Sequence, residues 1–371
     1  MIKFVCEKSL LVNAISVASR TVAQKSAISA LEGIHVKAGM FLYLSGYNLE
    51  TGITVTVPAD IQATGECIMP TRLFFDIIRK LPDEEVTIAV DDNYKVSIRC
   101  GISAFTITAM SAEDYPELPD VEYENAIKLP QRELRDLISG TIFSVSENQA
   151  RPIHTGCLIE VENTSITMVA VDGYRLALRR FYPEVPTERD AKFVVPAAAL
   201  KEVEKIVGDT DEPAGFTLGT KHILFEIGAV TLVCRILEGE FLDWRRVVPT
   251  NNPIRLGATR SMLTATIDRV GLIISEKIKS PVRCKFGKDR GEFQTITTIG
   301  EAFDVCDLAG DGKDLEIGFN CKYLLDALKA VPDDHVILEL SNGLSPIVLT
   351  PADGSARFTY MVLPVRLKAE G

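Results

Sequence analysis

Long apolar runs are absent from this sequence, and so is a secretory signal. No stretch reaches the ~18 consecutive apolar residues that a membrane-spanning helix needs. The N-terminal segment MIKFVCEKSL alternates polar and apolar residues and lacks the apolar core of a secretory signal. We therefore expect a soluble, cytoplasmic protein that makes no contact with a membrane.

Motifs of common enzyme and metal sites are missing as well. Gly310–Lys313 lacks the GxxxxGK(S/T) spacing of a phosphate-binding loop and is predicted to form a hairpin turn. The acidic segment Asp209–Glu212 is not followed by the glycine and glutamate of a calcium loop. Metal-ligand spacing is absent around the histidines, which are His35, His154, His222 and His335. We expect no catalytic residue, metal or cofactor, although the many Asp and Glu residues leave a metal-dependent nuclease open as an alternative.

The eight cysteines include no CxxC pair, and most lie in segments that alternate like strands. In a chain without a predicted secretory signal, this pattern favours buried, reduced thiols over disulfides.

A sequence pattern recurs at about one third of the length of the chain. At 371 residues, of which 46% are apolar, the chain is long enough for two or three domains with cores of their own, and the repeat favours three. Pro70, Pro196 and Asn320 open the repeated helices, and proline suits a first helical position because its missing N–H would have no partner there. The copies are MPTRLFFDIIRKLPDEEVTIAV (69–90), VPAAALKEVEKIVGDTDEPAGFTL (195–218) and FNCKYLLDALKAVPDDHVILEL (319–340).

Another helix is predicted ahead of each copy, and strands account for most of the rest. Apolar residues recur at helical spacing in Ser9–Val22, Gln131–Phe143 and Ser261–Ile274. Period-2 runs break at turn pairs such as Asp172-Gly173, Asp311-Gly312 and Asp353-Gly354. Each third is therefore predicted to be an α+β module of two helices and about eight short strands. The predicted domains are 1–125, 126–250 and 251–371, which meet at polar, turn-rich segments.

The net charge of −11 argues against a nucleic acid partner, but its distribution argues for one. The predicted helices, taken as residues 8–25, 70–81, 131–151, 196–207, 259–279 and 320–331, hold 17 Lys and Arg against 9 Asp and Glu. A modestly basic helical surface in an otherwise acidic chain suits a protein that surrounds a polyanion without gripping it. The alternative is that basic residues merely prefer helix ends.

Five segments resemble the bacterial beta sliding clamps, the family of the DNA polymerase III beta subunit. They occur in the order and at the spacing of that family, and together they extend the resemblance over essentially the whole chain. The segments are SAEDYPELP (111–119), VAVDGYRLAL (169–178), FLDWRRVVP (241–249), EIGFNCKYLLDAL (316–328) and YMVLPVRL (360–367).

The resemblance implies three tandem clamp modules, each with two helices packed on antiparallel sheets, and a head-to-tail homodimer that closes into a ring. Such a ring encircles double-stranded DNA independently of its sequence and is not an enzyme. The implied partners are the alpha subunit of DNA polymerase III and other polymerases, the clamp loader complex, and repair proteins that carry clamp-binding motifs. A scaffold of repeated α+β modules without a DNA role stays an alternative.

The family binds these motifs in a pocket between its second and third domains. Apolar side chains there would receive Leu or Phe anchors, and arginines would hold polar groups of the motif. Three positions depart from the usual residue types of the family. Leu242 stands where the family usually has proline, His154 stands where it has an apolar residue, and Pro346 replaces a small polar residue seen in some members. The matching positions are His154, Val171, Gly173, Tyr174, Arg175, Leu176, Leu242, Arg246, Val247, Asn320, Pro346, Met361, Leu363, Pro364, Val365 and Arg366.

The resemblance also implies a dimer interface. Phe105 and Ile107 of the first domain would meet Ile273 and Ile274 of the third domain. The alternative is that all four are ordinary core residues.

DNA contacts are implied for basic and polar positions, namely Lys25, Arg72, Arg79 and Asn148. Pro152 and Ile153 stand where some members of the family carry aromatic residues, so contacts to DNA at these two positions are expected to differ.

Overall fold

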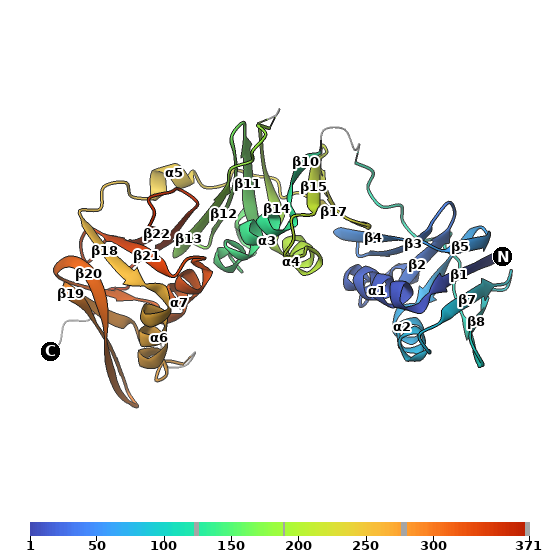
Figure 1. Cartoon of the computed structure of the whole chain (residues 1–371), viewed down its shortest axis with the longest axis horizontal. Helices are drawn as coiled ribbons and strands as arrows, with labels where there is room; N and C mark the ends of the chain where they lie inside the picture. The colour runs from blue at the N-terminus through green and yellow to red at the C-terminus, as the bar shows by residue number, and fades with distance from the viewer. Residues whose placement is uncertain (122–125, 188–189, 276–279, 368–371) are drawn as a thin grey trace. The chain divides into compact units, whose positions relative to one another are not determined.

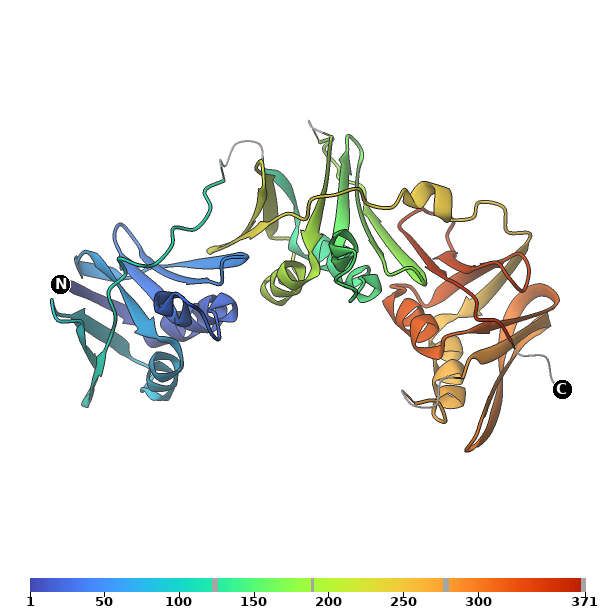
Figure 2. The ribbon, with the colours of Figure 1, turned by 180° about the vertical axis from the view of Figure 1, so that it is seen from behind.

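The computed structural model describes residues 1–121, 126–187, 190–275 and 280–367. Contacts divide the chain into two compact units, Met1–Arg135 with Lys201–Ile236, and Asp136–Leu200 with Leu237–Gly371 (Figures 1 and 2). The division falls within α3 (Gln131–Ser139) and α4 (Ala197–Ile206), so the middle third of the chain contributes to both units. The predicted boundary at residue 125 lies outside the described residues, and both predicted boundaries stay predictions.

The first unit holds two antiparallel sheets and the helices α1 (Lys8–Ala18) and α2 (Thr71–Lys80), which pack against each other. The larger sheet has the order β10 (Ile127–Pro130), β15 (Pro213–Leu218), β16 (His222–Ile227), β17 (Val230–Arg235), β4 (Thr51–Val57), β3 (Leu42–Tyr47), β2 (Gly33–Ala38), β6 (Gly65–Pro70). The smaller has the order β5 (Asp60–Ala63), β1 (Ile2–Glu7), β7 (Glu85–Val90), β8 (Lys95–Cys100), β9 (Ser103–Thr108). Pairing of β17 with β4 joins strands of the first and middle thirds in one sheet.

The second unit is built on one ten-stranded antiparallel sheet. Its order is β14 (Ala191–Pro196), β11 (Gly156–Glu162), β12 (Ser165–Val171), β13 (Arg175–Phe181), β23 (Phe358–Val362), β22 (Ile347–Pro351), β21 (His335–Leu340), β18 (Ile254–Thr259), β20 (Gly300–Phe319), β19 (Val282–Thr297). The helices α6 (Arg260–Gly271) and α7 (Cys321–Ala330) pack together, α6 against β19 and β20 and α7 against β23. Pairing of β13 with β23 joins the middle and last thirds.

Alternation of polar and apolar residues explains the strands. In β1, Ile2, Phe4 and Cys6 are buried while Lys3 and Glu7 are exposed, because successive side chains of a strand point to opposite faces. All eight cysteines are buried and free, as predicted. Burial raises the pKa of Cys67 to about 12, so this thiol stays neutral.

The repeated helices are present, but each begins one residue later than predicted. Pro70 and Pro196 end the strands β6 and β14, where they pair with Gly33 and Gly156. A proline suits the end of a strand for the same reason that it suits the start of a helix, since either place leaves an N–H unpaired. Asn320 precedes α7 as its N-cap. No helix among the described residues is long and apolar enough to cross a membrane.

The hairpin turn predicted at Gly310–Lys313 is wrong. This segment lies inside β20, where Gly310, Lys313 and Asp314 have positive φ values of 128°, 55° and 55°. These conformations bend the strand without ending it, so that Ala309 pairs with Gly257 of β18 while Asp311 pairs with Lys288 of β19. The described part of the last third therefore has six strands, two of them long, where about eight short strands were expected.

Candidate functional site

An open cavity of about 830 Å³ lies in the second unit. Four parts of the chain surround it: the turn between β12 and β13, the short helix α5 (Trp244–Val247) with Leu242, the first turn of α7, and the segment 145–154. One short 3-10 helix, Ile142–Ser144, precedes this segment, and another, Pro152–Thr155, overlaps its end. Residues far apart in the sequence therefore meet around one hollow.

The turn between β12 and β13 is fixed by its own side chain. Asp172 Oδ1 accepts hydrogen bonds from the backbone N–H groups of Tyr174 and Arg175, at 2.9 and 3.0 Å. Gly173 has φ 90°, a conformation that favours glycine, and a side chain added there would meet no atom within 4 Å. The predicted Asp172-Gly173 turn is confirmed, and it presents Tyr174 to the cavity with 62% of its surface exposed.

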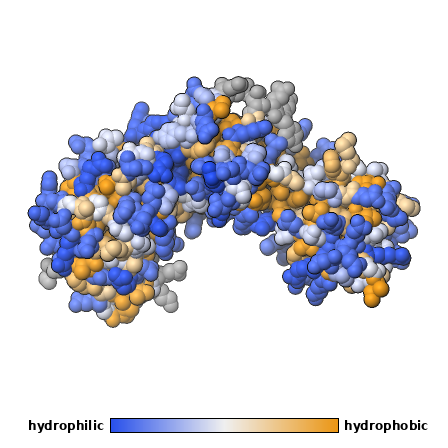
Figure 3. Space-filling view, in the orientation of Figure 1, coloured by the Kyte–Doolittle hydropathy of each residue, from blue (hydrophilic) through white to orange (hydrophobic). Residues whose placement is uncertain are grey.

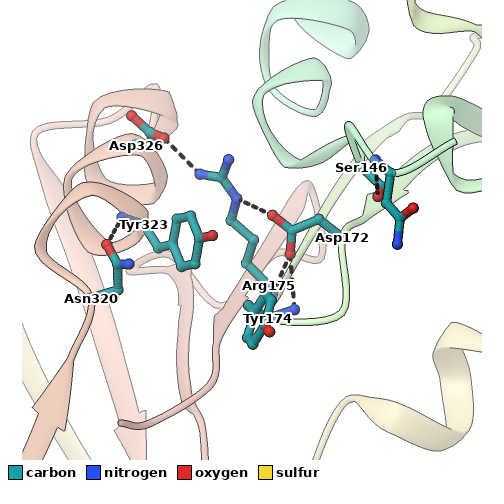
Figure 4. Close-up of polar contacts among 8 residues, drawn as sticks. Ser146, Asp172, Tyr174, Arg175, Asn320, Tyr323 and Asp326 are labelled. Atoms are coloured by element: carbon teal, nitrogen blue, oxygen red, sulfur yellow. Dashed lines mark hydrogen bonds and ion pairs between the residues drawn. The ribbon is translucent and has the colours of Figure 1, made fainter. Parts of the chain in front are cut away.

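Arg175 joins this turn to α7, as Figure 4 shows. Its Nε lies 2.9 Å from Asp172 Oδ2, and its Nη1 lies 2.6 Å from Asp326 Oδ2. The guanidinium also lies over the ring of Tyr323, 4.4 Å from the ring centroid. With two carboxylates engaged and only 9% of the residue exposed, Arg175 has little capacity left for the polar groups of a peptide. Its geometry favours a role in holding the cavity together.

The start of α7 supplies a further wall. Asn320 Oδ1 accepts a hydrogen bond from the backbone N–H of Tyr323 at 3.3 Å, which satisfies one of the free donors at the helix start. Tyr323 stacks on Tyr174 with ring centroids 6.1 Å apart (Figure 4). The cap and the stack together set where Lys322 and Tyr323 enter the cavity.

Buried apolar residues lie beneath the cavity. Leu176 and Met361 face each other across the β13–β23 pair, and both belong to a cluster that includes Val171 and Phe241. Just after β23, the backbone N–H of Leu363 donates a further hydrogen bond to Tyr174 O at 2.8 Å, next to the start of β13. Leu176 and Met361 are 1% and 4% exposed, so a ligand reaches them only if the residues above them move.

The structure brings together some of the predicted pocket residues but not all. Those that line the cavity are His154, Val171, Gly173, Tyr174, Arg175, Leu242 and Val247. Asn320 and Val365 line a neighbouring cavity of about 680 Å³ beside α7, and the remainder line neither: Leu176, Arg246, Pro346, Met361, Leu363, Pro364 and Arg366.

Other lining residues were not predicted for the pocket, namely Val145, Ser146, Glu147, Arg151, Asp172, Lys322 and Tyr323, and Asn148 was predicted to contact DNA instead. Lys322 and Tyr323 lie two and three residues after the helix-opening Asn320, which was a usable signal. The segment 145–151 carries no such motif, and only the fold brings it to the cavity.

The imidazole of His154 is held neutral at the edge of this site. Burial lowers the pKa of His154, and the positive charge of Arg151 lowers it further. The ring packs edge-on against Phe241, with centroids 5.2 Å apart. His154 therefore contributes an aromatic surface to the cavity. Within the described ranges, no group of three or more His, Cys, Asp or Glu is arranged to hold a metal ion.

The residues predicted to contact DNA are divided between the two units. Lys25, Arg72 and Arg79 belong to the first unit and are exposed, the last two on α2. Arg79 forms an ion pair with Asp76 at 3.1 Å. Asn148 belongs to the second unit, where it lines the cavity, and its Oδ1 accepts a hydrogen bond from the backbone N–H of Ala150.

The residues predicted for a dimer interface lie in different surroundings. Phe105 is 42% exposed on β9, which is the last strand of the five-stranded sheet. Ile107 on the same strand and Ile273 after α6 are half-buried, and Ile274 packs partly against the core of the second unit.

Figure 3 shows apolar patches on the surface, one of them over the free end of the β19–β20 hairpin, where Ile299 and Phe303 are exposed.

Comparisons with known proteins cover the whole chain. Its three parts match the N-terminal, central and C-terminal domains of the DNA polymerase III beta subunit, at residues 2–119, 128–243 and 245–366. The beta sliding clamp of Staphylococcus epidermidis is 30% identical over 99% of this chain and 100% of its own length.

Solved structures agree with this match. The DNA polymerase sliding clamp of Bacillus subtilis superposes with a TM-score of 0.94 at 27% identity, over 99% of this chain and 100% of its own. The beta subunit from the DNA polymerase of Streptococcus pyogenes gives a TM-score of 0.92 at 26% identity with the same coverage. These comparisons support neither the nuclease nor the scaffold without a DNA role, and they confirm the three-module α+β fold. The chain belongs to the family of the DNA polymerase III beta subunit, the beta sliding clamps.

Proposed function

We propose that this chain is a DNA sliding clamp, a processivity factor of DNA replication that acts in the cytoplasm and has no catalytic activity of its own. Two copies would close head to tail into a ring around duplex DNA. The observation that carries the proposal is the match over 99% of the chain to a protein named beta sliding clamp. A closed ring cannot leave circular DNA, so weak contacts suffice to keep it there, and a bound polymerase stays at high effective concentration near its template.

The cavity of the second unit is assigned to short peptide motifs carried by polymerases, the clamp loader and repair proteins. Leu242 and Val247 are 39% and 37% exposed and offer apolar contacts to a Leu or Phe anchor. Tyr174 adds a large exposed ring beside them. Arg246 and Arg366 are exposed and belong to the motifs shared with the family. Arg246 pairs with Asp243 at 3.0 Å, but this pair is open to solvent and can give way to a polar group of the peptide, whereas Arg175 is nearly buried between two carboxylates.

Opening of the ring would depend on the clamp loader. The sequence contains no phosphate-binding loop, so the energy of ATP would have to come from that partner. Closure of the ring is assigned to Phe105 and Ile107 against Ile273 and Ile274 of the second copy, with β9 offering an unpaired strand edge within the described part of the sheet.

Retention on DNA tests the topological mechanism. The protein is loaded onto nicked circular DNA with a compatible clamp loader and ATP, washed in high salt, and then followed before and after the circle is cut. We expect retention on the circle and release from the linear product, because high salt weakens phosphate contacts but does not open a ring. Equal loss from circle and line after loading would show that ordinary contacts hold the protein, and would contradict the proposal.

A further inference from the structure

A buried carboxylate lies behind the cavity and takes no part in lining it. Glu160 on β11 is 5% exposed. Its Oε2 accepts hydrogen bonds from Trp244 Nε1 at 3.1 Å and from Arg245 Nη1 at 2.8 Å, and its Oε1 lies 3.1 Å from Lys192 Nζ. Burial alone would raise the pKa of Glu160, but the donors from Lys192, Trp244 and Arg245 outweigh it and lower the pKa, so the carboxylate is ionised near neutrality.

The helix that carries Trp244 and Arg245 needs such an anchor. α5 is four residues long, and an isolated helix of that length is not stable in water because the first turn costs more conformational entropy than its few hydrogen bonds return. Asp243 precedes the helix but makes no side-chain cap. The guanidinium of Arg245 also lies over the Trp244 ring, 4.3 Å from its centroid, so the two side chains that reach Glu160 support each other.

The two ends of this anchored segment form one wall of the cavity. Leu242 precedes α5 and Val247 is its last residue, and both line the cavity with more than a third of their surface exposed. Trp244 and Val248, between and after them, pack instead against the apolar cluster beneath. Trp244 and Arg245 of α5 therefore bind Glu160, while Leu242 and Val247 at the two ends of the segment face the cavity.

We propose that Glu160 is a positioning residue for peptide binding: it fixes α5 through Trp244 and Arg245 and so sets the places of Leu242 and Val247 in the cavity wall. The proposal rests on the proposed function of the cavity as a peptide site. It predicts that loss of the charge on Glu160 weakens binding without touching any residue that contacts the peptide.

The chain offers its own reporter for this contact. Trp244 is the single tryptophan of the sequence, so with excitation at wavelengths that tyrosine does not absorb, the intrinsic fluorescence comes from the anchored side chain alone. In the full-length dimer, Glu160→Gln should shift the emission to longer wavelength and increase quenching by acrylamide, because the indole loses its charged partner. Arg245→Gln, which removes the same ion pair from the other side, should have the same effect.

Peptide affinity is measured on the same samples by fluorescence anisotropy, with a short synthetic peptide that ends in Leu-Phe and carries a fluorescein label. We expect Glu160→Gln and Arg245→Gln to raise the Kd by at least about fivefold, a size typical of coupling through an intermediate residue. Glu162→Gln is the matched control. Glu162 lies on the same strand and binds Arg245 at 2.9 Å, but it is exposed and makes no hydrogen bond with Trp244.

The outcomes separate the inference from the function on which it rests. Fluorescence changes and weaker binding in the two anchor variants, with neither in Glu162→Gln, support the role of Glu160. Wild-type affinity in both anchor variants overturns it, even if the emission shifts. Equal weakening by Glu162→Gln also overturns it, because the exposed contact of Arg245 would then account for the loss without the buried carboxylate. A wild-type chain that does not bind the peptide would overturn the proposed function of the cavity itself.

Discussion

Arg175 owes its position to a partner far away in the sequence. Its contact with Asp326 bridges 151 positions and connects the β12–β13 turn with α7. Asp326→Asn should leave a nearly buried guanidinium with one carboxylate in place of two, and we expect a loss of about 1–3 kcal/mol in the free energy of unfolding. Chemical denaturation monitored by circular dichroism measures this change.

Asp76→Asn is a suitable comparison for that substitution. It removes the carboxylate of an Asp–Arg pair in which both side chains are about half exposed, and such a pair contributes about 0–1 kcal/mol. An equal, small effect of both substitutions would show that the Arg175–Asp326 contact does not hold the cavity together.

Glu160 should also make stability depend on pH. Its pKa is lowered in the folded chain, so its stabilising contribution is fully present above the unfolded value near 4.5 and is lost as the pH falls through the lower folded value. Lys192 and Arg245 face the carboxylate, and the guanidinium of Arg180 lies over the ring of Trp244.

The expected result is a difference in unfolding free energy between the wild type and Glu160→Gln that is constant near neutrality and shrinks below about pH 4.5. Urea denaturation of both proteins across this range provides the measurement. A difference that does not change with pH would mean that the ionised form of Glu160 is not the source of its contribution.

Single residues of the site were predictable to different degrees, for physical reasons. Asp172-Gly173 predicts a turn because the hydrogen bonds of the Asp172 side chain and the positive φ of Gly173 depend only on neighbouring residues. Asn320 likewise predicts the start of a helix, because its side chain caps the backbone N–H of Tyr323 three residues later. The pairing of Arg175 with Asp326 has no local signature, since it arises only after β13 pairs with β23 and α7 packs on that sheet. The sequence therefore did not show that Asp326 would occupy the guanidinium of Arg175, and the predicted contact between Arg175 and a peptide did not take this partner into account.

Among the helices and strands, period and turn chemistry predicted the helices well and the long strands poorly. The helix predicted at Ser9–Val22 is present as α1 but gives way after Ala18 to a 3-10 turn, Ser19–Thr21, that an apolar spacing cannot distinguish. β20 contains Asp311-Gly312, a pair typical of hairpin turns, within a bend of a continuous strand. Because β20 pairs with β18 on one side and with β19 on the other, the chain bends at Asp311-Gly312 and does not reverse its direction there.

β9 is the element on which the proposed dimer depends. Phe105 is too exposed for a core residue, and it lies on the outermost strand of its sheet. Phe105→Asp should place a charge in an apolar contact between copies and convert the dimer to monomer, because an unpaired charge in an interface is strongly unfavourable. Sedimentation velocity at several concentrations measures the change.

Thr106→Asp is the matched control on β9. Thr106 is exposed too, but it points to the opposite face of the strand, so the same charge there should leave the dimer largely intact. Dimers of the Phe105→Asp protein at the wild-type affinity would exclude this face of β9 from the interface.

Across the chain as a whole, charge is distributed unevenly, and this distribution should govern the loading of the ring. The net charge is −11, yet the exposed basic residues Lys25, Arg72 and Arg79 of the first unit are proposed to meet DNA. Replacing all three by alanine should slow loading onto DNA. Each lost phosphate contact should also reduce the slope of log affinity against log salt by about 0.9.

A triple variant with the same loss of charge separates contact from net charge. Lys3, Lys37 and Lys95 are exposed residues of the same unit that lie on strands β1, β2 and β8. Loading rates are measured over a series of salt concentrations for both triple variants. If Lys25, Arg72 and Arg79 make the contacts, only their variant loses salt dependence, while the strand variant shows at most a uniform, screened slowing from the more negative chain. Identical rates and slopes for the two variants would mean that the chain's overall charge, and not these three side chains, controls its approach to DNA.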